Sequence, residues 1–193
     1  MSKAYQLQNI FFAFGVLCKL TVYDGDSVNT LNRAKTRVQE LEKNDSFDEP
    51  AAIGYAAQEV KRIFAQDGVT QATIKLGDTI INMGKTRRIG VRDPFSNKEQ
   101  NFAYLDVNEK SIVTLYRNEL KDTVSGRRSN VESVTLIGSD AVLLYKMCFI
   151  VIGYMLNEAL ALLNGSGYEA IVVTKDERVF TTSGLSRERQ IVA

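Results

Sequence analysis

The stretch PAAIGYAAQEVKRIFAQDGVTQATIKLGD, residues 50–78, decides the fold that the sequence predicts. Its first half is an amphipathic helix, because Val60, Ile63 and Phe64 recur at the spacing of a single helix face. Asp67-Gly68 ends this helix, since glycine takes the left-handed conformation beyond a helix C-terminus without a Cβ penalty. The apolar face predicts that the helix packs on a sheet.

A strand and a second turn follow this helix. Residues 70–76 alternate between polar and apolar side chains and stop at Gly77-Asp78. The turns on either side of the unit, residues 50–54 and Gly77-Asp78, expose backbone N–H groups, and anionic ligands bind at turns of this kind. Packing of a helix on a sheet explains the same pattern, so the spacing alone leaves both interpretations open.

The composition is that of a globular protein with balanced charge. A length of 193 residues suits one compact domain, 1–193, within which two halves, 1–84 and 85–193, can share a core. The 24 basic and 23 acidic residues give a net charge of +1, so no long-range field favours a nucleic acid or a membrane. Histidine is absent, which excludes histidine-based acid–base catalysis and histidine-ligated metals.

The cysteines and the N-terminus predict a cytoplasmic location. Cys18 and Cys148 both lie in apolar runs, which is typical of buried free thiols. The apolar run 10–20 before and around Cys18 is too short for a secretory signal, and Leu17 is not the small residue that a lipoprotein cleavage site requires.

Short strands outnumber helices along the rest of the chain. The fold class that this order predicts is α+β with a largely antiparallel sheet and packed helices. The expected strands are 10–23 (a pair, or one strand bent at a Gly15 bulge), 79–82, 86–92, 101–107, 111–116, 132–138, 169–174 and 178–182. A helix over 28–43, capped by Asp26 or Ser27, is expected to bury Leu31, Ala34, Val38 and Leu41.

Two further segments carry specific expectations. Residues 141–163 are apolar on nearly all sides, which predicts one long core helix with Asp140 as its cap. Residues 120–130 are polar and basic and predict an exposed loop.

The order of motifs resembles the FAD:protein FMN transferases of the ApbE family. The segments that are similar to the motifs of that family are FGVLCKLTVY (14–23), Asp45-Ser46-Phe47, residues 52–78, RRIGVRDP (87–94), SIVT (111–114), SVTLIG (133–138) and FIVIG (149–153). This resemblance implies an ApbE-like fold of two similar halves, and FAD or FMN as the ligand. It implies flavin contacts at six residues: Phe14, Gly54, Tyr55, Gly77, Asp78 and Thr114.

Departures from the family pattern concern the chemistry. The family lysine before Gly54 is Ile53, and the acidic residue that ends the same motif is Gln58. Counted back from Gly153, the metal-binding aspartate of the family falls on Leu143 and its partner threonine on Met147. These side chains have no oxygen ligands, so we expect no Mg²⁺ at the family position, and we assign no catalytic residue. A long family insertion that forms part of the flavin pocket is also missing.

Three smaller features have two interpretations each. Tyr55 stacks on a ligand ring or packs in the core; Arg87-Arg88 binds a phosphate or forms a solvated strand edge. Residues 67–73 resemble the sequence that such transferases modify, with Thr70 at the acceptor position, but they also form the predicted junction between helix and strand.

Three functions therefore stay open at the level of sequence. The chain is a degenerate family member that binds flavin without catalysis, an active FAD:protein FMN transferase, or a structural or regulatory partner. The expected partners are a flavoprotein, a full-length family member or a second copy of this chain.

Overall fold

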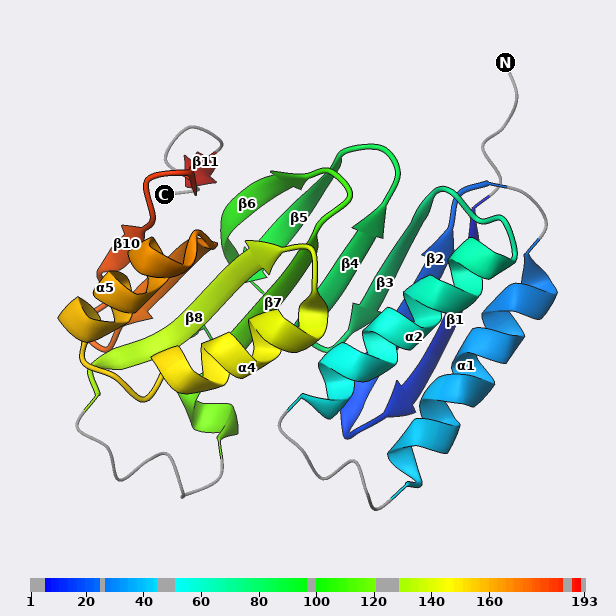
Figure 1. Ribbon diagram of the computed structural model, residues 1–193, viewed down its shortest axis with the longest axis horizontal. Coiled ribbons are helices and arrows are strands. Elements are labelled where there is room, and N and C mark those ends of the chain that lie inside the picture. The colour runs from blue at the N-terminus through cyan, green and yellow to red at the C-terminus, as the bar shows by residue number, and fades with distance from the viewer. Residues whose placement is uncertain are drawn as a thin grey trace.

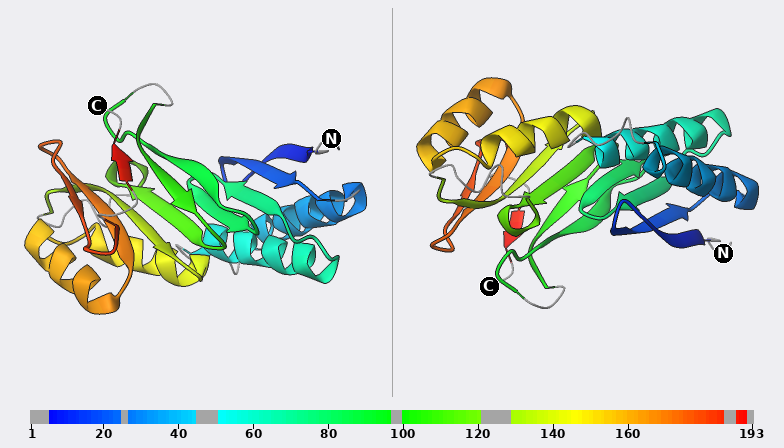
Figure 2. Two further views of the ribbon diagram at one scale, coloured as in Figure 1. Left: turned by 90° about the horizontal axis from the view of Figure 1, so that it is seen from above. Right: turned by 90° about the horizontal axis from the view of Figure 1, so that it is seen from below.

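The fold is a large antiparallel sheet with helices on one face and a smaller sheet on the other (Figures 1 and 2). The structure, a computed structural model, describes residues 6–24, 27–44, 51–96, 100–120, 129–185 and 189–191. Every strand pairing in the described part of the chain is antiparallel. The prediction of an α+β fold with a largely antiparallel sheet is confirmed.

The large sheet has eight strands in the order β1-β2-β3-β4-β7-β8-β9-β10. Their bounds are β1 Leu7–Ala13, β2 Val16–Val22, β3 Ala72–Leu76, β4 Thr79–Met83, β7 Ser111–Tyr116, β8 Val131–Gly138, β9 Glu169–Thr174 and β10 Val179–Thr181. The pairing of β4 with β7 joins strands from the two predicted halves into one sheet. The division into halves itself stays a prediction.

The small sheet has the order β11-β6-β5, with β5 at Arg87–Arg92, β6 at Asn101–Val107 and β11 at Arg189–Ile191. Its apolar residues, among them Val91 and Leu105, pack on Ile80 and Ile112 of the large sheet. Short β11 was not predicted from the sequence.

The helices are α1 (Val28–Glu42), α2 (Ala52–Gln66), α4 (Ala141–Val151) and α5 (Leu156–Ser166), with a 3₁₀ turn η2 at Arg117–Glu119. They form one layer, and α2 and α4 contact each other in front of the large sheet (Figure 1). No helix in the described ranges is long and apolar enough to cross a bilayer.

The helix and strand of the α2–β3 unit form as the sequence predicts, but the turn predicted over residues 50–54 is wrong for residues 52–54, which already belong to α2. Val60, Ile63 and Phe64 are buried, Gly68 has a φ of +77°, and Gly77 starts the β3–β4 turn with a φ of +58°. The buried stripe of α1 is also confirmed: Leu31, Ala34, Val38 and Leu41. Ser27 precedes α1 but its side chain makes no capping hydrogen bond, so the prediction of a Ser27 cap is wrong.

The segment 10–23 is a strand pair, as one of the two alternatives predicted. The bulge expected at Gly15 is wrong, because Phe14 and Gly15 form the two-residue turn between β1 and β2. Their φ values of 53° and 71° are those that a tight hairpin turn requires.

The single helix expected over 141–163 is wrong, because tertiary contacts break it after Val151. The Ile152 carbonyl accepts hydrogen bonds from Arg117 and from the hydroxyl of Ser129. The Leu156 N–H, which a continuous helix would direct at this carbonyl, donates instead to Asn130 Oδ1 at 2.9 Å. The chain therefore turns and starts α5 in a new direction.

Helix α4 is also less buried than its composition predicts. Ala141, Leu144, Cys148 and Val151 face the core, but Leu143 and Ile150 are 52% and 45% exposed. Three predicted loop segments, residues 25–26, 45–50 and 121–128, lie outside the described residues, and so does the family-like Asp45-Ser46-Phe47.

Candidate functional site

Two glycine turns lie at the same end of the large sheet. Cys18 in β2 is opposite Leu76 in β3, so the Phe14-Gly15 turn and the Gly77-Asp78 turn are neighbours. The Gly77 N–H donates to the Leu17 carbonyl at 3.1 Å. A Cβ at position 77 would lie 3.2 Å from the side chain of Val16. Both this close approach and the positive φ favour glycine at Gly77.

Asp78 joins this turn to the small sheet. Its Oδ2 lies 3.1 Å from Arg92 Nη2, and its carbonyl accepts the Thr114 N–H at 3.1 Å. The Arg92 guanidinium lies 4.1 Å from the ring centroid of Tyr116, whose hydroxyl donates to the Arg92 carbonyl at 3.3 Å. Asp78 thus holds Arg92 over an aromatic face at the end of the sheet.

Thr114 is next to Asp78 in space, but its hydroxyl is engaged within the sheet. It lies 3.0 Å from the hydroxyl of Thr135, and the residue is 8% exposed. Of the six predicted flavin contacts, the structure therefore brings Gly77, Asp78 and Thr114 together. That any of the six contacts a flavin stays a prediction.

Gly54 and Tyr55 belong to the helix layer. Gly54 packs on the start of α4, where a Cβ would lie 2.7 Å from the Ala141 carbonyl oxygen. Asp140 caps α4, as expected, by accepting the N–H groups of Val142 and Leu143 at 2.8 and 3.1 Å. Tyr55 is 36% exposed, so neither of its two interpretations is decided.

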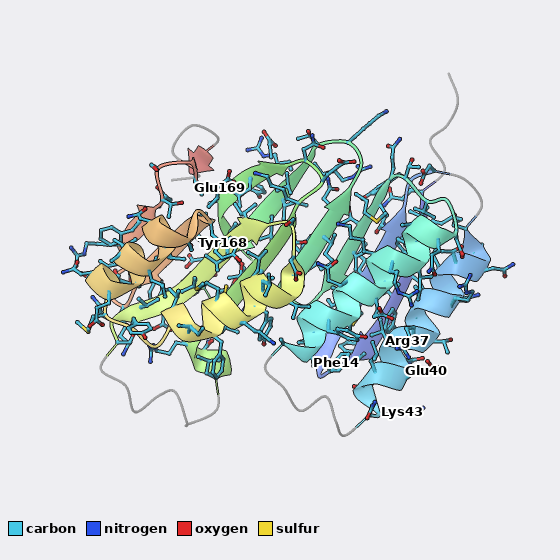
Figure 3. All side chains as sticks on the ribbon, viewed as in Figure 1. Phe14, Arg37, Glu40, Lys43, Tyr168 and Glu169 are labelled. Carbon is cyan, nitrogen blue, oxygen red and sulfur yellow. The ribbon has the colours of Figure 1, made fainter. Side chains whose placement is uncertain are left out.

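Phe14 lies at the tip of the β1–β2 hairpin and packs against the core on the helix side (Figure 3). Its backbone N–H donates to Glu42 Oε1 at 2.6 Å, which ties the hairpin to the end of α1. Phe14 thus contacts the helix layer. The side chains of Asp78 and Thr114 lie instead on the face of the large sheet that is opposite the helices.

A hollow opens between β2, β3 and β4 of the large sheet and β5 of the small one. It has a volume of about 420 Å³ and is lined by Val16, Leu17, Lys19, Lys75, Gly77, Asp78, Ile80, Gly90, Arg92 and Asn101. A second hollow of about 270 Å³ shares Lys19, Lys75, Ile80, Gly90 and Asn101 with the first and extends toward Tyr23 and Arg88. We call the two together the basic groove.

Lys19 and Lys75 were not predicted from the sequence as site residues. A signal was present, because each lysine interrupts an apolar strand at a position where alternation places the side chain opposite the helix layer. Arg87 and Arg88 are nearby in β5, and their guanidinium groups lie 3.3 and 4.8 Å from the ring centroids of Tyr23 and Tyr104.

Leu143 and Met147, the residues that the resemblance assigns to the family metal positions, have apolar side chains. Leu143 is 52% exposed and Met147 packs partly buried against the core. Among the residues that the structure describes, no group of three or more Cys, Asp or Glu side chains is placed to hold a metal ion. Thr70, at the acceptor-like position, donates its hydroxyl to Asp24 at 2.6 Å and so stabilises the junction before β3.

A family model named "ApbE family" matches residues 49–172, which is more than half of the chain. The chain belongs to the ApbE family. The matched region contains the α2–β3 unit, the Asp78–Arg92 pair and α4. No curated protein matches the sequence.

Solved ApbE structures have the same fold. The flavin transferase ApbE from Vibrio cholerae has a TM-score of 0.80 at 9% identity, covering 96% of this chain and 100% of that one. The ApbE protein from Thermotoga maritima has a TM-score of 0.78 at 12% identity, with the same coverage of 96% and 100%. The flavinyl transferase ApbE from Pseudomonas stutzeri has a TM-score of 0.61 at 15% identity, covering 72% of this chain and 52% of that one.

Proposed function

We propose that this ApbE-family protein binds a flavin nucleotide, FAD or FMN, and does not transfer FMN to an acceptor. The observation that carries the proposal is the contrast between two parts of the molecule. The glycine turns and the basic groove form a hollow at one end of the large sheet, and lysine and arginine side chains line this hollow. Leu143 and Met147, in contrast, present only hydrocarbon and thioether groups where metal chemistry would require oxygen.

The loss of transfer follows from the groups that phosphoryl chemistry uses. A divalent cation offsets the charge that develops on the phosphates, and it needs hard oxygen ligands. No histidine exists to act as a base. Ile53 packs against the core, and Gln58 donates to the Ser139 carbonyl at 3.5 Å. Each lost stabilising group costs about 3 kcal/mol of transition-state energy, although such losses do not add.

Two measurements test this proposal. The visible absorbance of flavin is recorded on the purified protein before and after addition of FAD and gel filtration, and we expect co-elution of flavin with the protein. A Thr-containing acceptor protein is then incubated with FAD, Mg²⁺ and this chain, with the Vibrio cholerae flavin transferase in a parallel reaction. We expect in-gel flavin fluorescence only in the parallel reaction; covalent flavin made by this chain alone would refute the proposal.

Metal binding gives a third, independent readout. Titration calorimetry with Mg²⁺ in the presence of FAD is expected to show no saturable heat, because Leu143 and Met147 offer no oxygen ligands. A clear saturable heat would instead support the active transferase as the function.

A second candidate function is that of a structural or regulatory partner, and an exposed apolar surface favours it. Leu143, Ile150, Tyr154 and Met155, at α4 and the turn after it, are 38–52% exposed. Exposed apolar side chains that gather in this way mark protein contact sites. The partner that this candidate names is a flavoprotein, a full-length family member or a second copy of this chain. Absence of flavin binding together with a stable complex would select it.

We also propose a cytoplasmic location. Cys18 and Cys148 are both free and buried, as expected for a protein of a reducing compartment.

A further inference from the structure

We propose that the basic groove binds a diphosphate group, with Lys19 and Lys75 as its two cationic ligands. The diphosphate belongs to free pyrophosphate or to a nucleotide, and the experiment below distinguishes the two sources. The inference does not rest on flavin binding, because pyrophosphate alone tests it.

The first observation is the register of β2 and β3. Lys19 lies directly opposite Lys75 in this antiparallel pair. Their neighbours Cys18, Leu20 and Ile74 belong to the core on the helix side, so both lysine side chains leave the opposite face of the sheet. Directly opposed residues have Cβ atoms about 5 Å apart, and like charges at such positions destabilise a sheet.

The second observation is that no carboxylate in the described part of the chain offsets this repulsion. Neither lysine side chain forms an ion pair or a hydrogen bond with any residue that the structure describes. Asp78 is the only carboxylate among the described residues that line the basic groove, and it pairs with Arg92 at 3.1 Å. Two opposed ammonium groups without a counter-ion predict an anionic ligand between them.

The third observation is the polar wall beyond the lysines. Thr21 and Thr73 are also directly opposite each other, two residues along the same face of the sheet from Lys19 and Lys75. The Thr73 hydroxyl lies 3.3 Å from that of Tyr23. On the facing side, Arg88 lines the basic groove and adds a further positive charge. These groups supply hydrogen-bond donors along the path that a phosphate-bearing chain would follow.

Gly90 of β5 shapes the facing wall. A Cβ built on Gly90 would lie 2.3 Å from Asn101 Nδ2, so only glycine lets the Asn101 amide lie across β5. Both residues line both hollows of the basic groove. The larger hollow, of about 420 Å³, falls in the range of small-molecule sites.

A diphosphate fits this arrangement better than a single phosphate. Lysine acts on phosphate as a compact point charge, so each ammonium group can serve one phosphate of a linked pair. Lys19 and Lys75 leave the same face of the sheet from directly opposed positions, so each ammonium group can contact one phosphate of a linked pair, whereas a single phosphate offers less charge to offset their repulsion.

The test is calorimetric titration of the full chain at low ionic strength with four probes: inorganic pyrophosphate, inorganic phosphate, ADP and FAD. Lys19→Gln and Lys75→Gln are compared with the control Lys146→Gln, an exposed lysine of α4 on the helix side. We expect pyrophosphate to bind more tightly than phosphate. Each groove variant should lose at least about tenfold in affinity, whereas Lys146→Gln should lose none.

The groove variants remain informative about folding. Because each removes one of two opposed charges, we expect Lys75→Gln without ligand to be at least as stable as the wild type in urea. Pyrophosphate affinity that is the same in Lys75→Gln and wild type would overturn the inference, as would an equal loss in Lys146→Gln.

The titrations with ADP and FAD distinguish a nucleotide from free pyrophosphate as the ligand. They also distinguish this inference from the proposed function. ADP binding that Lys75→Gln weakens assigns the diphosphate to a nucleotide, and pyrophosphate binding without ADP binding assigns it to the free anion. FAD binding that Lys75→Gln leaves unchanged, with no binding of pyrophosphate, overturns this inference and leaves the proposed function standing. Pyrophosphate binding without FAD binding supports this inference and overturns the proposed function.

Discussion

Gly54 of α2 packs against the backbone of Ala141 at the start of α4, so closely that a Cβ at position 54 would lie 2.7 Å from the Ala141 carbonyl oxygen. This contact joins the helix of the first half of the chain to the helix of the second half. Both helices lie within residues 49–172, the range that the family model matches.

Gly54→Ala is expected to destabilise the protein by about 1–3 kcal/mol, because the backbone of α4 must move to admit the methyl group. Gly165→Ala is the matched control: Gly165 lies in α5 and a Cβ there meets nothing within 4 Å. This control should be stabilised by up to about 1 kcal/mol through helix propensity. Urea unfolding measures both, and equal stability of the two variants would contradict the close approach.

Asp24 ties the end of β2 to the segment before β3. Its Oδ2 accepts hydrogen bonds from the Thr70 N–H at 2.8 Å, the Thr70 hydroxyl at 2.6 Å and the Gln71 N–H at 3.1 Å. We expect Asp24→Ala to lower the free energy of unfolding by about 1–3 kcal/mol near neutral pH, since three donors lose their acceptor. Asp106→Ala, at an exposed position of β6, should change it by less than about 0.5 kcal/mol.

The stabilisation by Asp24 should also depend on pH. Burial acts to raise the pKa of Asp24, but the hydrogen bonds from Thr70 and Gln71 outweigh it and hold the pKa below its ordinary value. A carboxyl group whose pKa is lowered by folding stabilises the folded state above its unfolded pKa of about 3.9. The stability difference between wild type and Asp24→Ala should therefore shrink as the pH falls below about 4. A difference that stays constant down to acid unfolding would exclude this role.

Both thiols should be unreactive in the folded protein. Cys18 and Cys148 are fully buried, and burial raises the pKa of Cys18 to about 11 and also raises that of Cys148. Thiolate is the reactive form, so at about pH 8 an aromatic disulfide reagent should react only after unfolding. Fast reaction of one equivalent without denaturant would show that a cysteine becomes accessible in the native state.

A carboxylate introduced in α4 should lower the free energy of unfolding less at Leu143 than at Met147. Leu143 is 52% exposed near the start of the helix, so Leu143→Asp should change the free energy of unfolding by less than about 0.5 kcal/mol. Met147 packs partly buried against the core, so Met147→Asp should cost about 1–2 kcal/mol and leave the protein folded. Circular dichroism with urea titration checks both, and an unfolded Met147→Asp variant would mean that this side chain is more deeply buried.

The sequence by itself determined the elements whose signals are local. The helix and strand of the α2–β3 unit formed as predicted because their apolar spacing, the positive φ at Gly68 and the turn at Gly77 depend on neighbouring residues alone. The bounds of β6 and β7 were predicted for the same reason. The motif order also predicted the ApbE family, which the family model confirmed over residues 49–172.

The tertiary structure decided what depends on distant partners. The predicted helix over 141–163 breaks because Arg117, Ser129 and Asn130, far away in the sequence, take over its backbone hydrogen bonds. Lys19 and Lys75 meet only through the register of β2 and β3, which depends on which strands become neighbours. A local pattern specifies a helix or a strand, but the identity of the residues across the sheet is specified only when the whole chain packs.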